Sequence, residues 1–131
     1  MLHLTADTRY RLFINGESVA VGPTRGSPWI WYYDTLDIAP YLQEGNNTVR
    51  FDVIRYFAAV RGAMPFQRTA LPGLTVIGRV ETANEAVHIN TAQNEYWEAQ
   101  VDEGVQFPME LVDDPFLHVC FLYTWLFYDA N

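Results

Sequence analysis

The segment between Gly22 and Asp34 gathers the side-chain types that carbohydrate sites use. Sugar C–H groups pack on flat aromatic faces, whereas sugar hydroxyls need planar donors and carboxylate acceptors. Both kinds occur here within ten residues, at Arg25, Trp29, Trp31, Tyr32 and Asp34. This combination predicts a carbohydrate-binding loop.

Two other interpretations fit the same residues. In one, Trp31 and a neighbouring tyrosine close the open end of a sandwich core or pack on another domain. In the other, exposed aromatic residues beside charged groups form a protein–protein interface. Packing is the commoner role for such residues, and we therefore expect Trp31 to be buried.

Catalytic motifs are missing from the sequence. Ser18 and Ser27 do not lie in a nucleophile elbow, and without lysine there is no phosphate-binding P-loop. Glycoside hydrolysis needs two carboxyl groups, but adjacent acids in an acidic, turn-rich chain are typically a solvated surface. The candidate acids are Glu95, Glu98, Asp102, Glu103, Asp113 and Asp114. We expect no catalytic residue and no cofactor.

Metal sites are not predicted either. The histidines His3, His88 and His118 are scattered, and no calcium-binding loop motif is present. The single cysteine, Cys120, excludes an internal disulfide and a cysteine-based zinc cage. We interpret it as a small buried apolar residue.

The overall charge excludes some partners. Eight arginines oppose 16 acidic residues, which gives a net charge of −8. Nucleic acids and anionic membranes both require a dense cationic surface, so neither is an expected partner. Half of the residues are apolar, which is typical of a folded domain. Met1–Asp7 lacks the features of a signal peptide, and residues 116–128 are too short to span a bilayer, so localisation stays open.

The apolar pattern has a period of two and predicts strands. Residues 9–15 place Tyr10, Leu12 and Ile14 on one face, and Asn15-Gly16 then predicts a hairpin with a return strand at 19–21. Further strands are expected at 32–38, 48–56, 74–82 and 87–90. Short strands separated by turns predict an all-β fold, a jelly-roll β-sandwich that forms a single domain over residues 1–118.

The order of several motifs resembles a known family. The run from Ala6 to Gly16, then 22–25, 31–35, 37–42 and 45–47, is similar to the N-terminal accessory β-sandwich of α-L-rhamnosidase-like glycoside hydrolases. The resemblance covers about residues 4–118 and implies a galactose-binding-like jelly roll. These motifs are turns and strand ends, and they specify a fold more strongly than a ligand.

The resemblance also implies what this chain lacks. In that family the catalytic carboxylates lie in a separate helical barrel far downstream, on which the accessory domain packs. A chain of 131 residues has no room for that barrel, so no catalytic residue carries over. The expected function is therefore a non-catalytic accessory or carbohydrate-binding module. The alternatives are a free-standing lectin-like protein, and a structural interaction module or truncated gene product.

The two ends of the chain depart from the family pattern. Upstream strands are expected in the family but do not precede Met1, which suggests that the domain is incomplete there. Residues 119–131 form an apolar tail that resembles nothing in the family, and we interpret them as translated intron. Because this tail is β-prone, uncharged up to Asp129 and free of proline, it also predicts poor solubility.

Overall fold

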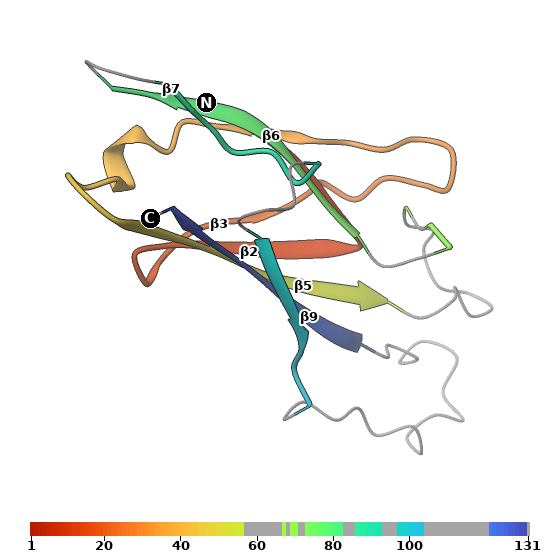
Figure 1. Ribbon diagram of the computed structural model, residues 1–131. Helices are drawn as coiled ribbons and strands as arrows, with labels where there is room; N and C mark the ends of the chain where they lie inside the picture. Colours follow the sequence, from red (N-terminus) through yellow and green to blue (C-terminus); the bar gives the residue numbers. More distant parts are fainter. Residues whose placement is uncertain are drawn as a thin grey trace.

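The computed structural model is an all-β protein with two antiparallel sheets (Figure 1). It describes residues 1–56, 67, 69–70, 73–82, 86–92 and 97–103, and the backbone of residues 121–130. The four-stranded sheet has the order β4-β1-β6-β7, and the five-stranded sheet has the order β3-β2-β5-β9-β8. The strands are β1 Leu2–Asp7, β2 Arg9–Ile14, β3 Glu17–Gly22, β4 Asp34–Leu36, β5 Asn47–Tyr56, β6 Gly73–Glu81, β7 Ala86–His88, β8 Trp97–Val101 and β9 Phe121–Ala130. One short 3₁₀ helix, η1, covers Ala39–Tyr41.

The predicted hairpin at the start of the five-stranded sheet is confirmed. Asn15 and Gly16 have φ angles of 51° and 84°, and β2 pairs antiparallel with β3. Positive φ at both positions suits a tight turn that follows the natural twist of the strands. Tyr10, Leu12 and Ile14 are buried on one face of β2, as the alternation predicts.

The later predicted strands are also present. β5 pairs with β2 and buries Val49, Phe51 and Val53. β6 pairs with β1 on one side and with β7 on the other, which confirms the predicted hairpin near residues 74–90. The expected strand at 32–38 is shorter in the structure, where β4 covers Asp34–Leu36.

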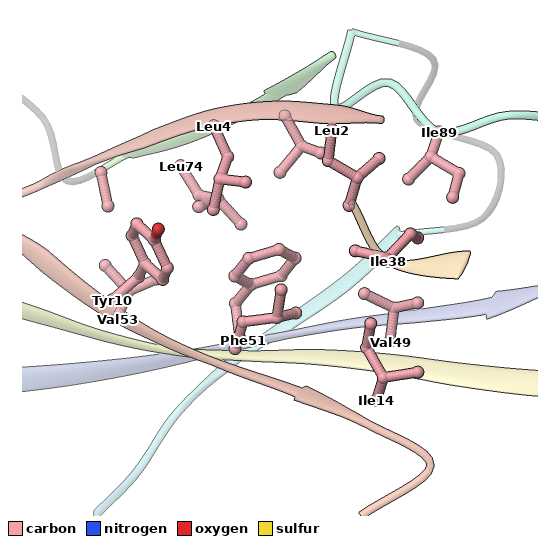
Figure 2. Packing of buried hydrophobic residues seen from close by; sticks show 13 residues of the cluster. Leu2, Leu4, Tyr10, Ile14, Ile38, Val49, Phe51, Val53, Leu74 and Ile89 are labelled. Carbon is pink, nitrogen blue, oxygen red and sulfur yellow. The ribbon is translucent and has the colours of Figure 1, made fainter. Parts of the chain in front are cut away.

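The core lies between the two sheets, as in a β-sandwich (Figure 2). Leu2, Leu4 and Leu74 point into it from the four-stranded sheet, opposite Tyr10 and Phe51 from the five-stranded sheet. The Phe51 ring contacts the Tyr10 ring edge-on at 5.9 Å between centroids. Burial of these apolar side chains from both sheets is the main force that holds the layers together.

Residues 121–130 lie inside the five-stranded sheet. The backbone of β9 pairs with β5 from Asn47↔Ala130 to Tyr56↔Phe121, and its other edge pairs with β8. The sequence pattern sets residues 119–131 apart as a tail, whereas the strand pairing in the structure does not stop at residue 118.

Candidate carbohydrate-binding loop

The loop of residues 23–33 links β3 to β4 and extends from one end of the sandwich, at the right of Figure 1. Its tip is a two-residue turn closed by a pair of backbone hydrogen bonds. Ser27 N–H donates to the Ile30 carbonyl (2.9 Å), and Ile30 N–H donates to the Ser27 carbonyl (3.2 Å). The Ser27 hydroxyl also accepts the N–H of Trp29 at 3.3 Å. Trp29 is therefore held by its backbone while its side chain is 91% exposed.

The loop is also anchored below its tip. Gly26 N–H donates to Gln67 Oε1 at 2.8 Å, and Gln67 Nε2 donates to the Thr8 carbonyl at 3.2 Å. Farther along, the Thr5 hydroxyl donates to the Tyr32 carbonyl at 2.7 Å. A loop whose backbone is fixed before a ligand arrives loses less conformational entropy on binding.

Thr69, two residues after Gln67, is held by an ionic network around the buried Asp7. Asp7 Oδ2 accepts both the N–H and the hydroxyl of Thr69, each at 2.8 Å. Arg55 Nε lies 3.5 Å from the same oxygen, and the Arg55 guanidinium also donates to the Thr69 carbonyl at 2.7 Å. Because Asp7 is buried, these partners are needed to offset the loss of its hydration.

Three neighbouring aromatic side chains are exposed as well. Trp31 is 38% exposed, Tyr33 is 66% exposed, and Tyr32 lies between these values. The expectation that Trp31 packs in the core is wrong. The base of the loop is filled instead by Tyr10 and Gln67, which are buried and hydrogen-bonded to the loop or its ends.

Asp34 has a role that its residue type did not predict. Its Oδ2 accepts the Tyr10 hydroxyl at 2.5 Å, and both groups adjoin Gly22 at the other end of the loop. Burial raises the pKa of Tyr10 far above its ordinary value, and the hydrogen bond and charge of Asp34 raise it further, whereas Arg9 lowers it. One carboxylate oxygen of Asp34 is thus engaged inside the protein, where it joins the two ends of the loop.

Arg25 is the one charged residue among residues 23–33, and its side chain is exposed. In the part of the chain that the structure describes, no acidic group pairs with it. Of the five residues predicted from the sequence, four are therefore exposed on one loop: Arg25, Trp29, Trp31 and Tyr32. Asp34 lies at the base of that loop.

Sequence reasoning missed the residues that continue this surface onto the four-stranded sheet. The His3 ring meets the Tyr33 ring edge-on at 6.0 Å, and His3 Nδ1 lies 2.9 Å from the Thr35 hydroxyl. His3 is also directly opposite Ile77 on β6. The alternation along each strand predicts from the sequence that His3 and Ile77 face outward. That they lie opposite each other follows only from the pairing of β1 with β6.

The structure describes three of the six candidate acids, Glu98, Asp102 and Glu103. Glu95, Asp113 and Asp114 lie outside the described residues, and so do His118 and Cys120, while Glu98 and Glu103 are exposed. Burial raises the pKa of the Asp52 carboxyl. The charges of Arg50 and Arg11 lower this pKa, and the charge of Asp102 raises it. Asp52 is nevertheless ion-paired, because Arg50 Nε lies 3.2 Å from its Oδ1.

Within the described ranges, no group of three or more His, Cys, Asp or Glu residues is arranged to hold a metal ion. The same ranges contain no helix of the length and hydrophobicity that a membrane crossing requires. Comparisons of the chain with protein-family models, with curated proteins and with solved structures yield no match. The site must therefore be interpreted from its own chemistry.

Proposed function

We propose that this chain is a non-catalytic, carbohydrate-binding accessory domain with a galactose-binding-like jelly-roll topology, of the kind found in α-L-rhamnosidase-like glycoside hydrolases. The observation that carries the proposal is the exposure of Trp29 and its aromatic neighbours on an anchored loop. Exposing large apolar rings is unfavourable unless a ligand or a partner covers them. Arg25 adds a planar hydroxyl-binding group to the same loop.

The residue types favour a sugar over other small ligands. Aromatic faces stack on sugar C–H groups, and a guanidinium donates several hydrogen bonds in one plane. The chain carries a net charge of −8, which opposes binding of polyanions. A neutral saccharide fits both facts.

The test is a titration with methyl α-L-rhamnoside, monitored by tryptophan fluorescence and by calorimetry. We expect saturable binding by the wild type and at least a tenfold weaker affinity for Trp29→Ala, with an unchanged far-UV circular dichroism spectrum. Val21→Ala is the matched control, because Val21 is exposed on β3, outside the loop. Equal affinities for Trp29→Ala and the wild type would exclude this loop as the site.

The second candidate function is an interdomain contact. The same exposed aromatic residues suit packing on a catalytic helical barrel in a longer parent chain, and such packing requires no sugar affinity. A full-length transcript that encodes such a barrel, together with absent saccharide binding, would favour this alternative. In either case we expect the chain itself to leave aryl α-L-rhamnosides intact.

A further inference from the structure

A concave feature lies on the other side of His3 from the loop of residues 23–33, which we call the aromatic loop. It is an open hollow of about 560 Å³ between η1 and the strands β1, β6 and β7. This volume falls within the range of ordinary small-molecule sites, about 300–1,000 Å³. The lining of the hollow includes the apolar side chain of Ile77 and the polar side chains of His3, Asp37, Arg79, Glu81 and His88.

The polar groups of the hollow include both donors and acceptors. Arg79 Nη2 lies 2.6 Å from Glu81 Oε1, so the cation at the rim is already neutralised by an acid. Asp37 Oδ1 accepts the Ala39 N–H at 3.1 Å, yet a carboxylate retains further acceptor positions. Asp37 and Glu81 would repel a polyanion. A fully apolar ligand would displace water from these two groups without replacing its hydrogen bonds. A neutral ligand with many hydroxyls can donate hydrogen bonds to the acidic groups and accept them from the cationic group.

The hollow and the aromatic loop share one continuous surface. Tyr33 ends the loop and contacts His3, and His3 lines the hollow next to Ile77. Ile77 is 58% exposed although it is a large apolar residue. The loop extends from one end of the sandwich, whereas η1 and β7, which border the hollow, lie toward the other end (Figure 1). A ligand that reaches both places must therefore be longer than a single sugar ring.

We infer that the ligand is an extended oligosaccharide, with one part on the aromatic loop and another in the hollow beside Ile77 and His88. This inference rests on the proposed function and names the size of the ligand. The exposed apolar side chain of Ile77 receives a sugar face, while Asp37, Arg79 and His88 exchange hydrogen bonds with hydroxyls. A monosaccharide would occupy the aromatic loop alone.

The experiment measures affinity against chain length, with L-rhamnose and rhamnose-containing di-, tetra- and hexasaccharides as probes. For the wild type we expect the affinity to rise at least tenfold from the monosaccharide to the hexasaccharide. The double variant Ile77→Ser/His88→Ala should lose this rise and keep the monosaccharide affinity. Trp29→Ala should weaken binding of every probe.

Val21→Ser is the matched control, because Val21 is as exposed as Ile77 but lies on the other sheet. Circular dichroism and thermal melting verify that each variant is folded. Affinity that is independent of chain length, or an Ile77→Ser/His88→Ala variant that behaves like Val21→Ser, would overturn the inference and leave the proposed function intact. Absence of binding to every probe would overturn both.

Discussion

Gly22 occupies a position where a side chain cannot be accommodated. A Cβ atom there would overlap Asp34 Oδ2 and would lie 2.6 Å from the Tyr10 hydroxyl oxygen. Both contacts are far below van der Waals distance, so the Tyr10–Asp34 hydrogen bond would have to open. The absence of a side chain at Gly22 is thus what allows the base of the aromatic loop to close.

We expect Gly22→Ala to destabilise the protein by about 1–3 kcal/mol, the usual cost of forcing extra volume into a packed site. Urea unfolding at neutral pH measures this change. Gly73→Ala is the control, because a Cβ atom added at Gly73 would meet no described residue within 4 Å other than its own neighbours in the chain. A stability loss no larger than that of Gly73→Ala would show that the base of the loop is loosely packed.

The raised pKa of Tyr10 makes the stability of the folded protein depend on pH. An unfolded tyrosine ionises near pH 10, whereas folded Tyr10 keeps its proton above that value. The folded state then binds more protons than the unfolded state, so this contribution to stability is present below about pH 10 and is lost as pH rises further. The loss approaches about 1.4 kcal/mol per pH unit.

Tyr10→Phe removes this titration together with the hydrogen bond to Asp34. We expect the variant to be about 1–3 kcal/mol less stable at pH 7. The difference from the wild type should shrink above about pH 10, as the wild type loses stability that the variant never had. Urea unfolding across this pH range provides the test, and a constant difference would disprove the linkage.

At the scale of elements, the aromatic loop depends on a segment distant in sequence. Gln67 connects Gly26 of the loop to Thr8 at the β1–β2 corner, and it does so with its side chain alone. Replacing Gln67 with leucine removes the side-chain acceptor of the Gly26 N–H, at a cost of about 1–3 kcal/mol. The loop should then detach from this corner while its tip stays closed by Ser27 and Ile30.

Amide hydrogen exchange distinguishes these two parts of the loop. In Gln67→Leu the Gly26 amide should exchange at least tenfold faster than in the wild type, because its acceptor is gone. The Ser27 amide is an internal control, because it donates to Ile30 rather than to Gln67. Equal acceleration at Gly26 and Ser27 would mean that the whole loop unfolds and that Gln67 is not its specific anchor.

The elements differ in how far the sequence predicts them. β2, β5 and β6 are readable because one face of each is buried, which produces a clear alternation. β9 is apolar at nearly every position, so it has no period, and its place between β5 and β8 is set by distant partners. β8 alternates between apolar and polar residues, but it is only five residues long and four of them are exposed, so its pattern is too short to predict a strand.

The site shows the same division. Sequence composition predicts which residues of the loop have the chemistry for sugar, and four of the five are exposed. The internal bond of Asp34 was not predictable, because it depends on Tyr10, which lies on a distant strand. Residue type alone also did not predict that Trp31 is exposed. His3 and Ile77 become neighbours only through the register of β1 with β6.

At the scale of the whole molecule, β9 determines whether the five-stranded sheet is continuous. Its backbone is paired on both edges, with β5 along ten residues and with β8 along five. In the described part of the chain, β8 has no other strand neighbour. Removing β9 would therefore expose the edge of β5 and release β8, including Trp97, whose ring packs against Phe51 in the core.

We expect deletion of residues 119–131 to lower the melting temperature by more than about 10 °C or to abolish cooperative unfolding, because strand pairing and cover of the core are lost. The open strand edges should also favour aggregation. Thermal melting and light scattering after size-exclusion chromatography measure stability and oligomeric state. Removal of Asn131 alone is the control, because the pairing of β9 with β5 ends at Ala130. The sequence by itself favours the opposite outcome, a more soluble chain after truncation at His118. A shortened chain that is monomeric and melts no lower than the full chain would show that β9 is dispensable and that the sandwich is complete with the strands before it.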